Sequence, residues 1–261
     1  MSFSHVTKLR MVMQELFHQA YRSRLIPFDP SDGLRLPKNV KGSHRSITEE
    51  ERAHILEVAQ YHPSGLWVLL ILYSGLRPGE AAALQWKDID FDKNEIHVYK
   101  AVESGTNTIK TPKTTAGIRD IPMRKELRRV LWREHGEPFS LLFPTRKGTI
   151  RGPSGIWKLW NSFAKELDLH MGALEEDGRI LQHAIAPDLT TYCLRHTFCT
   201  DLQRAGVAIN IAKELMGHSS IAVTADIYTH RDSNVLHENI SRLDTPTTNQ
   251  VLKMGENWWG N

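Results

Sequence analysis

Residues 189–230 read LTTYCLRHTFCTDLQRAGVAINIAKELMGHSSIAVTADIYTH, and the helical pattern of this stretch decides the fold class. It predicts three consecutive short helices, over 190–205, 209–216 and 221–229. Gly217 marks a tight turn after the second of them. Tyr192 and Arg195 are three residues apart, so we expect them on one face of the first helix.

The part of the chain before this stretch is also mostly helical, with one small sheet set into it. Residues 86–122 alternate short runs such as IHVYKAV and GIRDIPM with turn residues, which predicts an antiparallel sheet. Thr48 and Glu51 have the spacing of a capping box, and Ser64 can cap a second, very apolar helix. Further helices are expected over 124–135 and 153–167, and a polar, glycine-containing insertion over 170–188. The fold class is therefore mainly α with a small antiparallel β-sheet (α+β).

Periodicity and composition divide the chain into four segments. Residues 6–25 carry apolar positions at helical spacing, and the stretch that follows is rich in proline, glycine and charge. We expect a terminal helix over 1–25, a linker over 26–45, a main domain over 46–243 and a tail over 244–261. The terminal helix is too small to form a domain alone, which indicates that it belongs to a module mostly absent from this sequence.

Composition excludes several classes of protein. The chain has 261 residues, 40% of them hydrophobic and 24% charged, which is enough to bury a core and argues against wholesale disorder. No apolar run reaches the roughly 20 residues of a membrane span, and the first residues lack the layout of a secretory signal. Cys193 and Cys199 cannot build a disulfide framework, and no CxxC or Cys/His cluster predicts structural zinc. We expect a soluble cytoplasmic protein.

Charge is unevenly distributed along the chain. Residues 1–45 hold eight Lys and Arg against three Asp and Glu, whereas the rest holds 25 against 27. A basic arm on a near-neutral body is typical of nucleic-acid contact. An ordinary solvated surface explains the same numbers equally well.

Several short patterns carry residues suited to phosphate chemistry. They are GLRPGE at 75–80, KTPKTT at 110–115, YCLRHT at 192–197, LMGH at 215–218 and IYTH at 227–230. Arg77 is expected at a helix start, where free backbone N–H groups and the helix dipole favour an anion. Lys113 is expected in a turn between strands. Taken singly, each has an ordinary explanation: a capping arginine, a solvated lysine, a packing tyrosine and a capping histidine.

Taken together and in this order, GLRPGE, PKT, LRHTF, LMGH and IYTH resemble the motifs of the tyrosine recombinases, also called phage integrases. The resemblance covers about residues 45–240 and is strongest to integrases of Gram-positive prophages and conjugative transposons. It implies the mainly helical catalytic fold of that family, with residues 46–243 as the catalytic domain. Residues 1–25 would then be the last helix of a core-binding domain.

The resemblance also implies a role for each matching residue. Arg77 and Arg195 would hold the non-bridging oxygens of the scissile phosphate, and Tyr228 would be the nucleophile. Lys113 would protonate the leaving 5′ oxygen, and His218 would hydrogen-bond the phosphate. Glu80 would support the active-site arginine.

One position departs from the family pattern. The family usually has histidine three residues before the second arginine, and this sequence has Tyr192 there. A phenol donates a hydrogen bond to phosphate but is a poor general base at neutral pH, because its ordinary pKa is about 10. His196 points about 100° away from Arg195 on the helix and is interpreted as structural.

These residue types suit phosphodiester cleavage on physical grounds as well. A phosphodiester is an anion, and arginines supply permanent charge with bidentate geometry. A tyrosine nucleophile conserves the bond energy as a phosphotyrosine, so no ATP is needed. No cluster of metal-binding carboxylates is evident in the sequence, and the mechanism needs neither metal nor another cofactor.

The resulting hypothesis is a site-specific DNA recombinase acting at the bacterial nucleoid. Its expected partners are double-stranded DNA, further copies in a synaptic tetramer, and an accessory DNA-bending or directionality factor, with no membrane. One alternative is a truncated, catalytically impaired integrase that only binds DNA. Another is a strand-relaxing enzyme like the type IB topoisomerases, which the domain order and short motif spacing disfavour.

The C-terminal segment carries a further expectation. Residues 232–243 are predicted to form a helix with one apolar side, and Val251 to Trp259 form a short apolar tail beyond a Pro/Thr-rich break. Such a tail is expected to be covered, either by its own domain or by a neighbouring subunit.

Overall fold

The computed structural model describes residues 3–37, 45–103, 105–112 and 115–228. The chain divides into two compact units, Met1–Ser43 and His44–Asn261. This division lies close to the expected end of the linker at residue 45. Each unit is considered by itself.

The first unit is built around one long helix, α1 (Phe3–Arg22). It ends three residues before the expected position because Arg24 has a left-handed backbone, with φ +55°, which stops a helix. The His18 imidazole contacts Asp29 at 2.6 Å and holds the following segment against the helix. Apolar side chains such as Leu16, 65% exposed, leave one face of α1 uncovered within this unit.

The second unit begins with three helices, α2 (Glu49–Val58), α3 (Gly65–Ser74) and α4 (Pro78–Ala83). The predicted capping box is confirmed at α2, where Thr48 and Glu51 each accept a hydrogen bond from the other's backbone N–H. Ser64 occupies the N-cap of α3, as expected, although its side chain makes no capping hydrogen bond. α3 is apolar all round and forms the centre of the core.

The strands form two small sheets between α4 and α5 rather than the single one expected. β1 (Ile89–Asp90), β2 (Glu95–Val98) and β5 (Arg119–Pro122) are antiparallel in the order β1-β2-β5. β3 (Ala101–Val102) and β4 (Ile109–Lys110) form a separate antiparallel hairpin. In the three-stranded sheet Ile96 lies opposite Ile121, and both are buried against the core.

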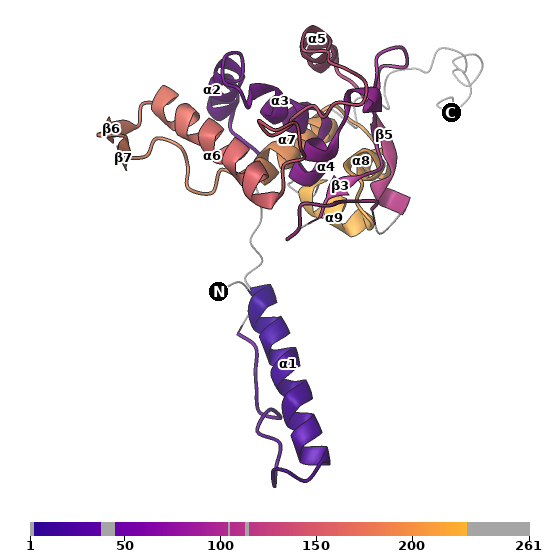
Figure 1. The fold of residues 1–261 in the computed structure, drawn as a ribbon, viewed down its shortest axis with the longest axis vertical. Coiled ribbons are helices and arrows are strands. Elements are labelled where there is room, and N and C mark those ends of the chain that lie inside the picture. The colour runs from indigo at the N-terminus through magenta and orange to yellow at the C-terminus, as the bar shows by residue number, and fades with distance from the viewer. Residues whose placement is uncertain (1–2, 38–44, 104, 113–114, 229–261) are drawn as a thin grey trace, which may run out of the picture. The chain divides into compact units, whose positions relative to one another are not determined.

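Five more α-helices follow within the described part of the unit. They are α5 (Lys125–Arg133), α6 (Pro153–His170), α7 (Thr191–Arg204), α8 (Ile209–Met216) and α9 (Ile221–Tyr228). Helix α6 extends three residues beyond its predicted end at residue 167. α3 packs against α7, and the last three helices pack against one another, as Figure 1 shows. The mainly α fold with small antiparallel sheets is confirmed.

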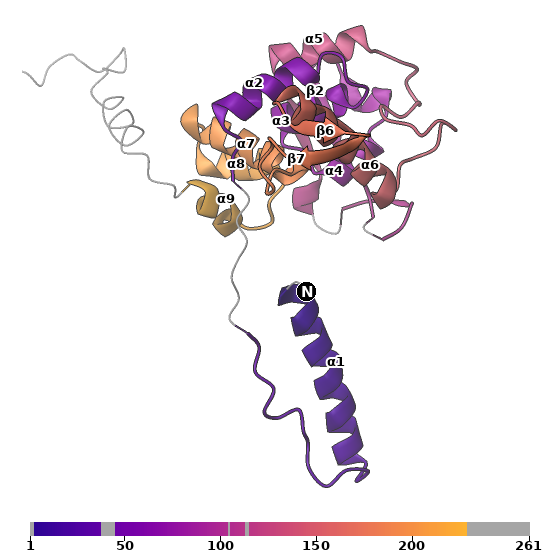
Figure 2. The ribbon, with the colours of Figure 1, turned by 90° about the vertical axis from the view of Figure 1, so that its left-hand side faces the viewer.

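A third antiparallel hairpin lies where the sequence predicted only a polar insertion. β6 (Leu174–Glu176) pairs with β7 (Arg179–Gln182), and Figure 2 brings this hairpin to the front. Asp177 and Gly178 both have positive φ, as a two-residue hairpin turn requires. The Asp-Gly pair was therefore a usable signal. Among the described residues, no helix is long and apolar enough to cross a membrane.

Candidate active site

Three arginines from distant parts of the chain meet at the C-terminal end of α8. Arg77 precedes α4, Arg119 begins β5 and Arg195 lies on α7. Each donates to a different backbone carbonyl at that end: Arg119 Nε to Leu215 and Arg77 Nη2 to Gly217, both at 2.8 Å, and Arg195 Nη2 to Met216. The last carbonyls of a helix lack partners within the helix and carry partial negative charge, so guanidinium groups suit them.

Glu80 is the acidic centre of this cluster. Its side chain is 3% exposed and accepts two hydrogen bonds from Arg119 and one from the Arg77 side chain. The Arg77 backbone N–H donates to the same carboxylate at 2.9 Å. Burial favours a higher pKa for Glu80, but the hydrogen bonds and charge of Arg119, aided by Arg77 and Arg195, lower that pKa to about 2. One carboxylate thus faces three guanidinium groups, and the cluster keeps a positive excess.

Arg195 is the more deeply buried of the two arginines that the sequence singled out. It is 5% exposed, and its Nη1 donates to the carbonyl of Gly75, the left-handed residue that ends α3. Burial and the neighbouring charge of Arg77 lower the pKa of Arg195 to about 9. The guanidinium therefore remains protonated at neutral pH.

Arg77 is the accessible member of the cluster. Its side chain is 38% exposed, against 2% for that of Arg119. It lies with Glu80 and Tyr192 on the wall of an open pocket of about 690 Å³ that also includes Trp157 and Trp160. An incoming anion therefore reaches Arg77 first.

His218 follows the turn at Gly217, whose φ is +63°, and is 8% exposed. Its Nδ1 lies 2.9 Å from the Thr224 hydroxyl on α9. Burial, together with the charges of Arg195, Arg77 and Arg119, lowers the pKa of His218 to about 4. The imidazole is therefore neutral at pH 7 and held in a fixed orientation.

Tyr192 lies in the first turn of α7 and is 46% exposed. It is close enough to Arg195 to interact with the guanidinium charge, as expected for two residues on one helix face. His196 lies on a half-buried part of the same helix. The structure therefore places Tyr192, rather than His196, at the pocket that holds Arg77.

Two predicted site residues fall partly or wholly outside the described part of the chain. Tyr228 is the last residue of α9, and the structure describes its backbone but not its side chain. Lys113 lies between β4 and β5 and is not described. Its neighbour Lys110 is on β4, with Nζ 2.6 Å from a Glu103 carboxylate oxygen.

Sequence analysis missed two residues of this cluster, Arg119 and Thr224. Arg119 alternates with Ile121 and Met123 on the inward side of β5 and the residues after it, and an arginine at such a position needs a buried partner. That alternation was the available signal. Thr224 gave none, because its contact with His218 depends on how α9 packs against α8.

Comparison with known proteins agrees with the family that the sequence motifs resemble. The family model for the phage integrase family matches residues 45–234. The chain is 29% identical to a tyrosine recombinase XerC-like protein of Caldanaerobacter subterraneus subsp. tengcongensis, over 86% of this chain and 62% of the relative. It is 28% identical to the transposase from transposon Tn916 of Enterococcus faecalis, over 82% and 53% respectively. The chain thus spans between about half and two thirds of the length of these relatives.

Among solved structures, the Tn1549 transposon integrase (residues 82–397) in complex with circular intermediate DNA has the same fold. The TM-score is 0.69 at 23% identity, over 93% of this chain and 81% of the other. The lambda integrase dimer bound to a COC′ core site is a more distant match, with a TM-score of 0.57 at 18% identity over 88% of this chain and 61% of the other.

Proposed function

The chain belongs to the phage integrase family, and we propose that it is a site-specific DNA recombinase, cleaving and rejoining DNA through a 3′-phosphotyrosine. The observation that carries the proposal is the arginine cluster around Glu80. It offers a partly exposed guanidinium backed by two buried ones, which is the charge arrangement that a phosphodiester needs.

Arg77 and Arg195 are proposed to hold the two non-bridging oxygens of the scissile phosphate. In the structure these arginines donate to carbonyls at the ends of α3 and α8. A phosphate oxygen is a stronger acceptor than a carbonyl and carries charge, so it replaces one of these partners. Arg119 keeps its two bonds to Glu80 and positions that carboxylate beside Arg77.

His218 is proposed to donate a hydrogen bond to the phosphate as a neutral imidazole. In the tautomer in which Thr224 donates to Nδ1, the ring proton is on Nε2. This proton stabilises negative charge that develops on a phosphate oxygen. Tyr192 is proposed to contact the phosphate through its phenol in the place of the usual histidine.

The covalent step is proposed to join Tyr228 to the DNA. The phenol of Tyr228 gives up its proton to solvent and its oxygen attacks phosphorus. The bond from phosphorus to the 5′ oxygen breaks, and Lys113 gives that oxygen a proton. Attack by the freed 5′ hydroxyl of a partner strand reverses these changes and releases Tyr228. The phosphotyrosine conserves the energy of the phosphodiester bond, so the reaction consumes no ATP and the proposed steps use no metal.

The proposed partners follow from this chemistry. They are double-stranded DNA, other copies of the chain in a synaptic tetramer, and an accessory DNA-bending or directionality factor. The similarity to the Tn916 transposase supports a place on a mobile element. The predicted helix over 232–243 and the apolar tail lie outside the described residues, and we propose that the tail docks on a catalytic domain, in cis or in trans.

A pool of nicked duplexes of random sequence tests the proposal without a known target. A nick beside the cleavage point releases the short strand and traps the covalent complex. Wild type should form adducts that withstand detergent, and joined recombinant strands when a partner duplex is added. Binding without adducts would indicate a non-catalytic DNA-binding protein, and relaxation of supercoiled plasmid without joining would indicate a topoisomerase-like enzyme.

A further inference from the structure

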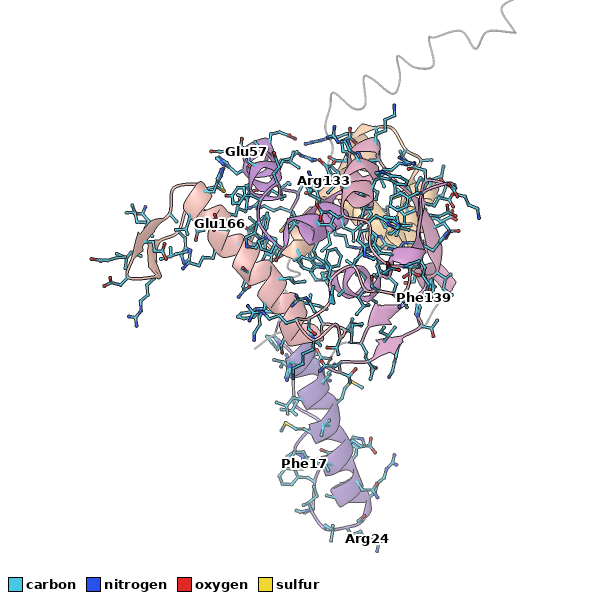
Figure 3. All side chains as sticks on the ribbon, turned by 45° about the horizontal axis from the view of Figure 1, so that its top comes forward. Phe17, Arg24, Glu57, Arg133, Phe139 and Glu166 are labelled. Atoms are coloured by element: carbon cyan, nitrogen blue, oxygen red, sulfur yellow. The ribbon has the colours of Figure 1, made fainter. Side chains whose placement is uncertain are left out.

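Two histidines meet across the contact between α2 and α6, away from the arginine cluster. His54 lies on α2, and His170 is the last residue of α6. Their Nδ1 atoms are 3.0 Å apart, and the other ring nitrogen of His170 lies 3.3 Å from a carboxylate oxygen of Glu57. Glu57 is three residues after His54, on the same face of α2. Figure 3 labels Glu57 on α2.

We propose that His54 and His170, with Glu57, bind a divalent transition-metal ion of the zinc type, which links α2 to α6. A tetrahedral zinc ion takes imidazole nitrogens at about 2.0–2.1 Å, which places two such nitrogens about 3.3 Å apart. The observed 3.0 Å between the Nδ1 atoms needs to open by only a few tenths of an ångström. Both rings are half-buried between packed helices, so they are already close to the required positions.

Glu57 fixes the His170 ring in the tautomer that suits metal binding. When the Nε2–H of His170 donates to this carboxylate, the ring presents a lone pair at Nδ1, which is the arrangement usual for a metal-bound histidine. In the metal-free state His54 donates its Nδ1 proton to that lone pair. Metal binding requires only that His54 carry its proton on Nε2 instead.

The carboxylate of Glu57 is also close enough to become a ligand. One of its oxygens and one ring nitrogen of each histidine all lie within 4.8 Å of one another, and the side chain is 62% exposed, so it can leave the Nε2–H of His170 and turn toward the metal. The set is then two imidazoles and one carboxylate, with the remaining position open to water.

Within the described residues, two other groups of three side chains could hold a metal ion, and both suit zinc less well. The first combines His18 with Asp29 and Asp32, and the second combines His97 with Glu95 and Asp120. Each has one imidazole and two carboxylates, a set better suited to harder ions than to zinc. In the second group, the Nδ1 of His97 is already paired with Asp120 at 2.6 Å.

The consequence of binding is mechanical. At the N-terminal end of α2, Glu51 accepts two hydrogen bonds from Arg45. The N-terminal half of α6 lines the pocket that includes Arg77. A metal ion at the other end of both helices therefore fixes their relative position without contacting the proposed catalytic residues. Since it binds the folded state, it raises the temperature of unfolding in a concentration-dependent manner.

The test is calorimetric titration of ZnCl₂ into the full chain, purified without a histidine tag and stripped with chelator, combined with thermal unfolding. Wild type should bind zinc and unfold at a higher temperature with it. His54→Gln and His170→Gln should each bind at least about tenfold more weakly and lose the thermal shift. Glu57→Gln, at a side chain that is 62% exposed, should lower the zinc affinity about tenfold.

His62→Gln and His97→Gln are the matched controls. His62 links the same region to α6 through Ser162, with Nε2 to Oγ at 3.2 Å, but lies outside the group of three. Both control variants should bind zinc as wild type does. The proposal is overturned if wild type shows no thermal shift, if the His54, His170 and Glu57 variants bind zinc normally, or if His97→Gln alone abolishes binding.

Discussion

Arg119 and Glu80 form a buried, two-bond ion pair that ties β5 to α4. The Nη2–Oε2 distance is 2.9 Å and the Nη1–Oε1 distance is 3.2 Å, and both side chains are almost fully buried. The same carboxylate holds Arg77, so one pair connects the strand, the helix and the accessible arginine that we propose binds phosphate. The position of Arg77 therefore depends on a residue far from it in the sequence.

Removing Glu80 should be costly, because it leaves buried guanidinium groups without a counter-charge. We expect Glu80→Ala to lower the free energy of unfolding by about 3–5 kcal/mol. Glu103→Ala, which removes the surface partner of the exposed Lys110, should cost less than about 1 kcal/mol. Urea denaturation of the two variants checks this, and equal costs would show that Glu80 does not have the central role inferred for it.

His218 should make the fold sensitive to acid. Its folded pKa of about 4 lies below the ordinary 6.5, so the unfolded chain takes up a proton first as the pH falls. The contribution is fully present above pH 6.5 and is lost between pH 6.5 and 4, by about 3 kcal/mol. His218→Gln should flatten the dependence of unfolding free energy on pH between 7.5 and 5.

His97 gives the control of opposite sign. Its hydrogen bond to Asp120 raises the pKa of His97, so its contribution is present at low pH and lost as the pH rises through the folded value. His97→Gln should therefore make the loss on acidification larger. If both variants flatten the profile, the assignment of the acid sensitivity to His218 is wrong.

Gly217 should tolerate no side chain. Its φ is +63°, and a Cβ there would lie 2.6 Å from Nη1 of Arg119. Gly148 has a φ of +75° with nothing within 4 Å, so Gly148→Ala measures the backbone strain alone. We expect Gly217→Ala to destabilise the protein by more than Gly148→Ala and to reduce DNA cleavage, which Gly148→Ala should leave intact. Indistinguishable unfolding midpoints would contradict the packing at this turn.

Lys113, rather than Lys110, should be the general acid. Lys113→Ala should slow cleavage strongly on ordinary DNA, and a substrate with a 5′-bridging sulfur should restore the rate, because thiolate leaves without a proton. Lys110→Ala serves as the control, since this lysine is paired with Glu103. Failure of the sulfur substrate to rescue Lys113→Ala would refute the leaving-group role.

Local signals predicted much of the fold. Helix α8 begins and ends as predicted, and the capping box at Thr48 forms as expected, because both features depend on neighbouring residues. The hairpin β6–β7 was missed although Asp177 and Gly178 signalled a turn, since its strands are exposed and carry no clear alternation.

The candidate site was predictable in its parts but not in its connections. Motif spacing identified Arg77 and Arg195, and the structure brings both to the end of α8. Nothing in the sequence indicated that Arg119 and Arg77 share Glu80, or that His54 and His170 are in contact. These contacts join residues separated by 39 and 116 positions, and only packing decides them.

The most direct measurement is the identity of the residue that carries DNA after cleavage. Trypsin releases Tyr228 in the peptide 214–231 and Tyr192 in the peptide 180–195, and each peptide contains one tyrosine. Mass spectrometry of adducts trapped on nicked DNA should find the nucleotide on peptide 214–231, and Tyr228→Phe should give no adduct while binding DNA normally. A nucleotide on peptide 180–195, or adducts that persist in Tyr228→Phe, would contradict the proposed nucleophile.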